Sequence, residues 1–347
     1  MSPVDILLAI LGISVLVIIH EGGHYFAARL FGMRVLRFSI GFGPKLFHYQ
    51  SKTSHTVFQV CAIPFLAYVQ IAGMNPHEDV DPQDPELFPN KSWLARATTI
   101  FAGPFANYLT ASILVFGLAL HGWPEDRPTS PMVVQQVNEG SPAAKAGIRS
   151  GDLILEANGQ KVKSVDDLIR ITAPRAGKPT EYRIERQGRA LEPITLTPMR
   201  HDSRGVIGVS AKLERRYKPL PLGEAASAAV LFPYRITSAQ LVGLADLVKR
   251  RSTEGLTGPV GMGKIVAEQA GKGPAEYIAI LVLLSVALGM FNLLPFPALD
   301  GGRLTFLAYE LITRRRPNER FEAVVHTVGL LFLIGVLVLV TFRDVMG

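Results

Sequence analysis

Residues 6–30 read ILLAILGISVLVIIHEGGHYFAARL, an apolar run that ends in the pattern HEGGH at residues 20–24. The run is long enough to cross a bilayer, which takes roughly 20 residues of apolar helix. On a helix, His20 and His24 project from one face, where two imidazoles can occupy two corners of a zinc tetrahedron. Glu21 stands beside them, placed to accept a proton from a metal-bound water. Ionisable groups in such a segment are costly and usually functional, so the stretch predicts hydrolytic zinc chemistry within a membrane.

Two plainer interpretations of this stretch compete with zinc binding. An HExxH match also arises by chance on ordinary surface helices. The apolar start could instead be a secretory signal, but Asp5 stands where a basic cluster is expected, and no small-residue cleavage site precedes the motif. The apolar context and a third candidate ligand, described below, favour zinc over both.

The composition is that of an integral membrane protein with one soluble module. Charged residues make up 19 % of the 347, and the mean hydropathy is +0.25. A less apolar segment, residues 222–248, predicts an amphipathic helix at the membrane surface, with a fifth span as the alternative. Four stretches are long and apolar enough to span the bilayer: residues 6–30, 94–120, 277–296 and 323–342.

The net charge of +7 is explained by basic residues on the cytoplasmic side of a membrane. No basic stripe or RNA-binding signature accompanies it, so nucleic acid is not an expected partner. Both termini and residues 121–275 then lie outside the cytoplasm. The single cysteine, Cys61, excludes an intrachain disulfide. The residues that set this orientation are Arg34, Arg37, Lys45 and Lys52 after the first span, and Arg314, Arg315 and Arg316 before the last.

Short alternating strands and turns replace the apolar pattern between the second and third spans. Residues 141–159, SPAAKAGIRSGDLILEANG, closely resemble the PDZ fold. PDZ domains bind an extended peptide as an added strand, so a peptide or protein ligand is expected; a module that serves only as a spacer is the alternative. The predicted elements are strands at 132–137, 151–159, 182–186 and 194–197, and helices at 143–148 and 165–169.

A third zinc ligand is needed for a hydrolytic site, and Asp300 is the best candidate. It lies in residues 292–302, NLLPFPALDGG, where two prolines and a glycine pair break a helix at membrane depth. Such a break is tolerated where the backbone lines a cavity or packs inside protein. Asp300 would complete a His₂Asp set. Its alternative role is to cap the helix that follows.

The motifs occur in the order HExxH, GFGP at 41–44, NKS at 90–92, AGPxxN at 102–107, the PDZ-like run, and NLLPxPxLDGG. In this order, over essentially the whole chain, the sequence resembles the site-2 protease family of intramembrane zinc metalloproteases. It is most similar to the bacterial branch that cleaves membrane-anchored anti-sigma factors. The resemblance implies that His20, His24 and Asp300 bind Zn²⁺ and that Glu21 is the catalytic base. It also implies that Asn292 contacts the substrate or its carbonyl; an amide that only packs or caps is the alternative.

The implied fold is a multi-span α-helical membrane protein of about four transmembrane helices, with an inserted extracytoplasmic PDZ domain of the α+β class. Residues 41–44 and 56–69 would form membrane-associated loops or a re-entrant β-hairpin whose edge holds the substrate extended. The expected domains are an N-terminal membrane part at 1–125, the PDZ domain at 126–212, an interfacial helix and linker at 213–275, and a C-terminal membrane part at 276–347.

Three departures from the family pattern bear on specificity. Gly22 replaces a bulky apolar residue, and together with Gly23 it weakens the helix by roughly 1 kcal/mol per glycine. Leu66-Ala67 stands where relatives often carry a glycine pair, and Arg303 stands where many carry histidine. Six further histidines have no ligand spacing and are predicted to be non-catalytic: His48, His55, His77, His121, His201 and His326.

The implied activity is hydrolysis of a peptide bond within or near the transmembrane segment of a single-span membrane protein, either an anti-sigma factor or a remnant signal peptide. The expected location is the bacterial inner membrane, with the active site toward the cytoplasm and the PDZ domain in the periplasm. Two other hypotheses are a non-catalytic membrane adaptor that recruits partners through the PDZ domain, and a metal carrier. The intact Glu21 argues against an adaptor. Too few ionisable residues in the spans argue against a carrier.

Overall fold

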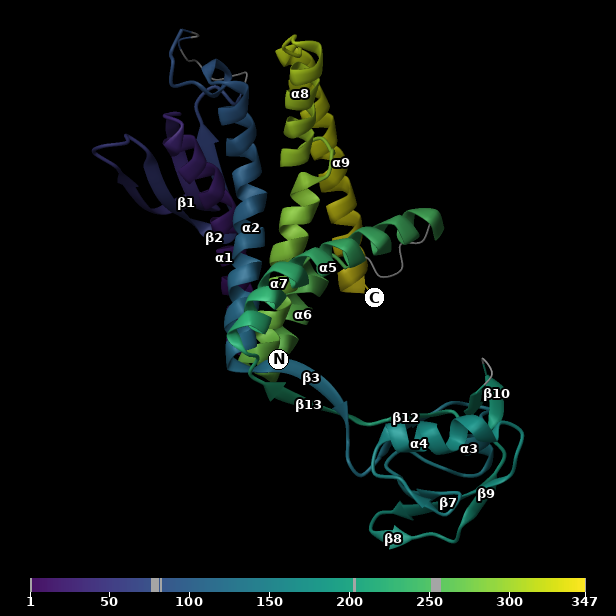
Figure 1. Cartoon of the computed structure of the whole chain (residues 1–347). Helices are drawn as coiled ribbons and strands as arrows, with labels where there is room; N and C mark the ends of the chain where they lie inside the picture. Colours follow the sequence, from purple (N-terminus) through teal and green to yellow (C-terminus); the bar gives the residue numbers. More distant parts are fainter. Residues whose placement is uncertain (1, 76–80, 82, 202–203, 251–256, 347) are drawn as a thin grey trace. The chain divides into compact units, whose positions relative to one another are not determined.

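The computed structural model describes the chain except for residues 1, 76–80, 82, 202–203, 251–256 and 347. The chain divides into two compact units (Figure 1). The first combines residues 1–120 and 220–347, and the second comprises residues 121–219. The predicted non-catalytic His77 and the side chain of Leu66 lie outside the described part.

Four of the described helices are long and apolar enough to cross a membrane: α1 (Pro3–Leu30), α2 (Trp93–Gly122), α7 (Pro274–Leu293) and α9 (Glu319–Met346). They match the four predicted spans, and the protein is a membrane protein. The third ends three residues before its predicted end at Phe296, because Pro295 and Pro297 cannot continue the helical hydrogen bonding.

Three further helices complete the first unit: α5 (Leu222–Arg250), α6 (Pro259–Lys272) and α8 (Asp300–Thr313). α5 covers the segment predicted to be an amphipathic helix and is not among the helices apolar enough to span. α6 lies where the sequence suggested only a linker. It buries Val266 and Ala267 against Ala9 of α1, and the Asp344 carboxylate accepts hydrogen bonds from the backbone at its start. Its stability therefore comes from tertiary contacts rather than from a strong local pattern.

The segment between α1 and α2 forms an antiparallel hairpin of β1 (Val35–Gln50) and β2 (Val57–Ile71), followed by a short 3₁₀ helix at Phe88–Asn90. Each strand bends and pairs twice, since Phe38 lies opposite both Phe58 and Val69. The four resulting segments lie side by side in the order 45–50, 57–63, 35–40 and 67–71. Residues 67–71 therefore form an outer edge, and this edge becomes important at the site.

The hairpin packs against α1 through aromatic side chains, and Figure 1 shows β1 and β2 beside that helix. The Tyr25 ring makes edge contacts with Phe38 and Phe58, at centroid distances of 5.7 and 5.6 Å. Gly41 adopts a left-handed conformation at the bend, where a Cβ would lie 2.6 Å from the Ile63 carbonyl oxygen. Glycine is thus required for the strand to turn at this point of the GFGP motif.

The second unit has its own hydrophobic core, built around the fully buried Met132, Ile154, Tyr182 and Ile184. A buried Asp152 carboxylate holds the unit together through hydrogen bonds from the Arg186 guanidinium at 2.7 and 2.8 Å. Its helices are α3 (Pro142–Lys145), α4 (Val165–Thr172) and a 3₁₀ turn at Ala173–Arg175. Its strands are β3 (Trp123–Pro128), β4 (Val134–Val137), β5 (Leu153–Ala157), β6 (Gln160–Lys161), β7 (Thr180–Arg186), β8 (Arg189–Ala190), β9 (Ile194–Leu196), β10 (Met199–His201), β11 (Arg204–Val206), β12 (Val209–Ala211) and β13 (Leu213–Lys218).

The predicted strands and helices occur in the predicted order, with ends shifted by up to three residues, while β6, β8 and β10 to β12 were not predicted. The main sheet runs β6-β5-β7-β8, with β9 also paired to β7, while β12 pairs with β4. β3 and β13 pair antiparallel where the chain enters and leaves the unit.

Candidate metal centre

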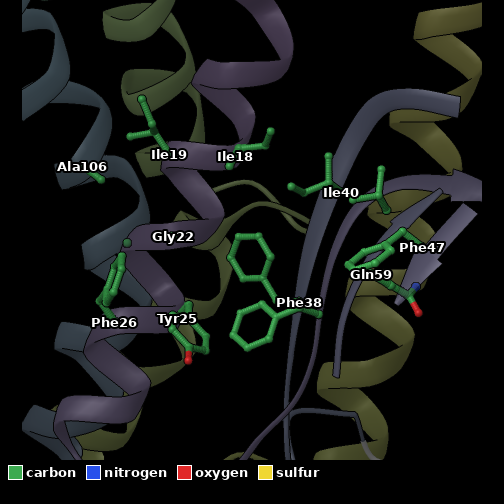
Figure 2. Close-up of a pocket in the computed structure, with 13 residues that line it drawn as sticks. Ile18, Ile19, Gly22, Tyr25, Phe26, Phe38, Ile40, Phe47, Gln59 and Ala106 are labelled. Carbon is green, nitrogen blue, oxygen red and sulfur yellow. The ribbon is translucent and has the colours of Figure 1, made fainter. Parts of the chain in front are cut away.

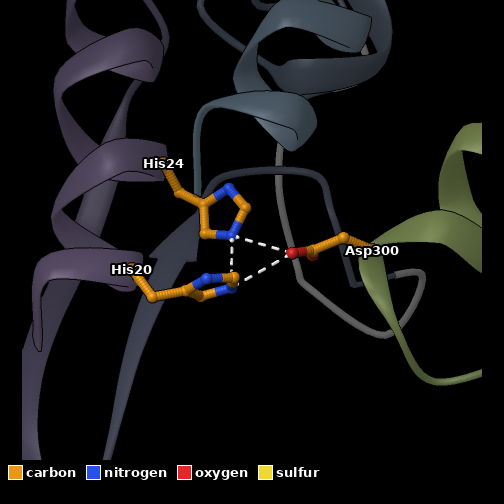
Figure 3. A group of neighbouring side chains, drawn as sticks. All are labelled: His20, His24 and Asp300. Carbon is orange, nitrogen blue, oxygen red and sulfur yellow. Dashed lines mark hydrogen bonds and ion pairs between the residues drawn. The ribbon is translucent and has the colours of Figure 1, made fainter. Parts of the chain in front are cut away.

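Two helices bring three potential ligand atoms together (Figure 3). His20 and His24 lie one turn apart in α1, and Asp300 is the first residue of α8. Asp300 Oδ2 lies 3.1 Å from His20 Nε2 and 3.2 Å from His24 Nε2, and the two Nε2 atoms are 3.3 Å apart. Within the described part of the chain, this is the one group of three or more His, Cys, Asp or Glu side chains close enough to share a metal ion.

The spacing of these atoms fits zinc. Ligand bonds of 2.0–2.1 Å to a tetrahedral ion put the ligand atoms about 3.3 to 3.4 Å apart, and the three observed separations are 3.1–3.3 Å. Two imidazole nitrogens and one carboxylate oxygen are also ligands that zinc accepts, and three protein ligands leave the fourth corner for water or substrate. The structure thus brings together the three residues that the sequence singled out.

Helix α2 orients the His24 ring without providing a ligand. His24 Nδ1 donates a hydrogen bond to the Thr99 carbonyl oxygen at 2.9 Å, which leaves the Nε2 lone pair for a metal. Two glycines permit this close approach. A Cβ on Gly103 would overlap His24 Nε2, and a Cβ on Gly23 would overlap the Ala102 carbonyl. The glycines of HEGGH and AGPxxN therefore allow α1 and α2 to touch at the site.

A buried amide orients the His20 ring in the same way. The Asn107 side chain is fully buried and contacts His20 Nδ1 at 2.9 Å. With a metal on Nε2, Nδ1 carries the hydrogen, so the amide oxygen of Asn107 must face it. This orientation also gives Asn107 Oδ1 a hydrogen-bond partner. With the amide nitrogen facing the ring instead, this buried oxygen has none. Ser285 of α7 donates to the Asn107 carbonyl oxygen at 2.8 Å and fixes this part of α2.

Asp300 does not cap its helix, so the capping alternative is wrong. The N-cap position belongs to Leu299, with no side-chain cap hydrogen bond, because the Asp300 carboxylate turns toward the two histidines. A metal held here would require an ionised Asp300 carboxylate together with two neutral imidazoles.

The Glu21 carboxylate lies between the histidines and the hairpin. Its Oε2 accepts a hydrogen bond from the backbone N–H of Val69 at 3.0 Å. Val69 belongs to the 67–71 edge, so this edge lies directly beside the site. Glu21 is not part of the three-ligand group, which leaves its carboxylate available for another role.

The remaining predicted residues lie away from the three ligand atoms. Asn292 Nδ2 donates to the Leu288 carbonyl oxygen one turn back in α7, at 3.0 Å, and the amide is not in the metal group. Exposed positions are occupied by four of the other histidines: His48, His55, His121 and His201. His326 behaves differently, because its Nδ1 accepts a hydrogen bond from the backbone of Ala298 beside the Asp300 turn. Sequence reasoning missed this contact, and it missed the roles of Thr99 and Asn107.

An apolar cavity of about 520 Å³ lies between α1 and the hairpin, with Ala106 of α2 also in its lining (Figure 2). Ile18, Gly22 and Tyr25 line it from the helix, and Phe38 and Phe58 from the hairpin. At 100° per residue, Gly22 projects about half a turn away from the two histidines. A Cβ there would meet only the Phe26 ring, at 3.9 Å. The departure at Gly22 therefore opens this cavity and leaves the metal centre untouched.

Residues 8–336 match the family model described as Peptidase family M50. The chain belongs to peptidase family M50. It is 32 % identical over 361 residues to a Rhizobium meliloti protein named "Putative zinc metalloprotease R01501", covering 96 % of this chain and 94 % of the relative. A Clostridium perfringens protein named "Putative zinc metalloprotease CPE1693" is also 32 % identical, covering 98 % of each chain. Metalloprotease MmpA of Caulobacter vibrioides is 30 % identical, covering 96 % of this chain and 93 % of that protein.

The family membership confirms the predicted resemblance, and with it a zinc metalloprotease in which Zn²⁺ is the cofactor. Among solved structures, the PDZ domain of the SdrC-like protein from Listeria monocytogenes matches 24 % of this chain and 88 % of its own, at 24 % identity and a TM-score of 0.21. With a TM-score this low, that match supports no conclusion about the chain.

Proposed function

We propose that this member of family M50 is an intramembrane zinc protease that cleaves single-span membrane proteins, with His20, His24 and Asp300 as the zinc ligands and Glu21 as the catalytic base. The observation that carries the proposal is the spacing of the three ligand atoms at the edge length of a zinc tetrahedron, with the Glu21 carboxylate beside them. His20 and His24 lie near the end of α1, which is apolar enough to span, and Asp300 begins α8 shortly after the end of α7, a second such helix.

Bound zinc would supply a water of pKa near 7 and would polarise a substrate carbonyl. Glu21 accepts one proton from the attacking water as the new C–O bond forms at the carbonyl carbon. It then gives that proton to the amide nitrogen as the C–N bond breaks, so that the products are one carboxyl and one amino terminus. Thr99 and Asn107 hold the two imidazoles in the tautomer that keeps each Nε2 free for the metal.

The hairpin edge at residues 67–71 is the proposed substrate dock. A scissile amide is hidden inside a helix, so the substrate must be extended before it can react. An exposed strand edge pairs with an extended peptide through backbone hydrogen bonds. The Val69–Glu21 hydrogen bond supports this placement, because a strand added at this edge would pass the base. Asn292, in α7, would contact the substrate near its carbonyl.

The proposed orientation puts the metal centre near the cytoplasmic face of the bacterial inner membrane. Basic residues follow α1 and α8 and favour the cytoplasm at those ends. The unit at 121–219 then lies in the periplasm, where we propose that it acts as a PDZ domain for a peptide or protein ligand. The re-entrant position of the hairpin in the bilayer belongs to the same proposal. The substrate would be an anti-sigma factor or a remnant signal peptide.

The test compares purified wild-type protein with Glu21→Gln on a single-span membrane substrate, with zinc content measured in parallel. Glu268→Gln is the matched control, because Glu268 is an exposed carboxylate on α6 paired only with Lys272. We expect Glu21→Gln to keep its zinc while cleavage falls by about 10²- to 10⁴-fold, and the control to cleave normally. Normal cleavage by Glu21→Gln would refute the assignment of the base, and wild-type protein without zinc would refute the ligand set.

A further inference from the structure

Helix α9 is the most apolar of the four candidate spans and the least buried. Its most apolar window has a mean hydropathy of 2.7, and 6 % of that window lies inside the protein. Such a helix could serve as a plain membrane anchor. One face of α9 also packs against protein. Three residues on this face contact the turn between α7 and α8: His326, Gly329 and Phe332.

His326 holds this turn through a specific hydrogen bond. Its Nδ1 accepts from the backbone N–H of Ala298 at 2.9 Å, and its side chain is only 17 % exposed. The imidazole also lies against the Phe306 ring of α8, with centroids 5.6 Å apart. The histidine thus bridges the last span, the turn and the helix that begins with Asp300.

Close packing next to this hydrogen bond also holds α9 against the turn. A Cβ on Gly329 would overlap Pro297, so only glycine allows the helix to approach this far. One turn further along, the Phe332 and Phe296 rings lie 5.8 Å apart. Together these contacts fix residues 296–298 against α9.

The backbone held by His326 is one that alanine disfavours. Ala298 has φ of +72°, in the left-handed region that side chains other than glycine rarely adopt. A turn in this conformation relaxes unless its surroundings hold it. Ala298 lies two residues before Asp300, whose carboxylate oxygen must stay within about 0.2 Å of its place to complete a zinc tetrahedron.

We infer that His326 is a positioning residue of the metal centre: its Nδ1 holds the turn at Ala298 so that Asp300 stays at the third corner of the tetrahedron. The inference rests on the proposed ligand set and deepens it, because it gives the last span a part in zinc binding. His326 does not touch the metal, the substrate or the reacting atoms.

Two substitutions separate the hydrogen bond from simple packing. His326→Asn keeps an acceptor at the δ1 position but loses the ring, and His326→Phe keeps a ring against Phe306 but loses the acceptor. Leu331→Phe serves as the control, because Leu331 lies on α9 and is 64 % exposed. The full chain of each variant is purified in detergent, and its zinc affinity is measured by competition with a chelator. Cobalt-substituted protein then gives the visible absorption spectrum of the ligand set.

We expect His326→Phe to weaken zinc binding by about 10- to 100-fold, the usual effect of losing a group that supports a metal ligand, and to change the cobalt spectrum. His326→Asn should stay near the wild type, as should the control. The inference is wrong if His326→Asn and His326→Phe lose zinc affinity equally, or if His326→Phe loses none. In either case, zinc binding by the wild type would leave the proposed ligand set intact. Wild-type protein that binds no zinc would remove the proposed site, and this inference with it.

Discussion

Two adjacent glycines in α1, the helix that carries the proposed ligands His20 and His24, should respond oppositely to the same substitution. Alanine at Gly22 would place its Cβ in the apolar cavity, with the Phe26 ring as its nearest neighbour at 3.9 Å. Alanine at Gly23 would place its Cβ 2.7 Å from the Ala102 carbonyl carbon, in the backbone of α2. Ordinary contact begins at 3.4 Å, and the Cβ would overlap the Ala102 carbonyl oxygen even more closely than the carbon. The two helices must therefore separate by more than about 0.7 Å, since backbone cannot rotate away as a side chain can.

The magnitudes follow from these contacts. Alanine favours a helix by about 1 kcal/mol over glycine, so Gly22→Ala should gain roughly that in stability and keep its zinc. Gly23→Ala gains the same propensity but loses about 1–3 kcal/mol to overpacking. The separation also exceeds the tolerance of about 0.2 Å for a metal site, because α2 holds both histidine rings. Zinc affinity should therefore fall by at least 10-fold, the lower end of the loss expected when groups that orient the ligands are disturbed.

The assay measures thermal unfolding in detergent and zinc affinity by chelator competition for both variants beside the wild type. Gly22→Ala should melt at or above the wild-type temperature with unchanged zinc affinity, whereas Gly23→Ala should lose affinity. If both variants keep zinc equally well, the close contact of α1 and α2 does not constrain the metal centre, and the geometric reasoning fails.

Three further substitutions test other contacts. Asn107→Leu should weaken zinc binding by about 10- to 100-fold by removing the hydrogen bond to His20, and unchanged chelator competition would contradict this. Glu310→Gln weakens a partly buried pair in which Arg96 donates at 2.6 and 2.9 Å. It should cost up to about 3 kcal/mol, because the buried Arg96 charge loses its counter-ion, and a thermal shift measures the loss. Burial acts to raise the pKa of Asp152, but hydrogen bonds from Arg186 and from the Arg149 backbone hold it below its ordinary value. This pair therefore stabilises the 121–219 unit above about pH 4, the unfolded pKa of an aspartate, and the stabilisation is lost as the pH falls through the folded value. The protection of the β5 amides against exchange, corrected for the intrinsic exchange rate at each pH, should fall below about pH 4 in the full chain, and Asp152→Asn should remove that acid dependence.

The features that could be predicted from the sequence are those that depend on residues close together in the chain. The helical spacing of His20 and His24, the apolar spans, and the strand-and-turn pattern of residues 132–197 depend on neighbouring residues, so each is visible in the sequence. Even the pairing of these histidines with Asp300, 280 residues away, could be proposed, because zinc chemistry demands a third ligand. Site residues with a chemical signature were therefore within reach of sequence reasoning.

Contacts without such a signature could not be predicted. The Thr99 carbonyl that orients His24 is backbone, which any residue would provide. His326 lies in a segment whose composition indicates only a lipid-facing span, and its role depends on a turn that another helix begins. The double pairing of the hairpin depends on a bend at Gly41 rather than on an alternating pattern. α6 is stabilised by contacts with α1 and α7 rather than by its own residues, and for this reason its sequence alone was interpreted as a linker.

The arrangement of the metal centre explains why α2 needs small residues and an amide where it meets α1. The proposed ligands come from α1 and α8, and α2 provides none of them. It instead approaches α1 at Gly103 closely enough for the Thr99 carbonyl and the Asn107 amide to reach the two Nδ1 atoms. A larger residue at Gly103 would occupy the space of the His24 ring itself. The AGPxxN motif is therefore needed to orient the two histidine rings, because its glycine sets how closely α2 approaches α1. Only at this distance can Thr99 and Asn107 hold both imidazoles so that their Nε2 atoms could bind the same ion.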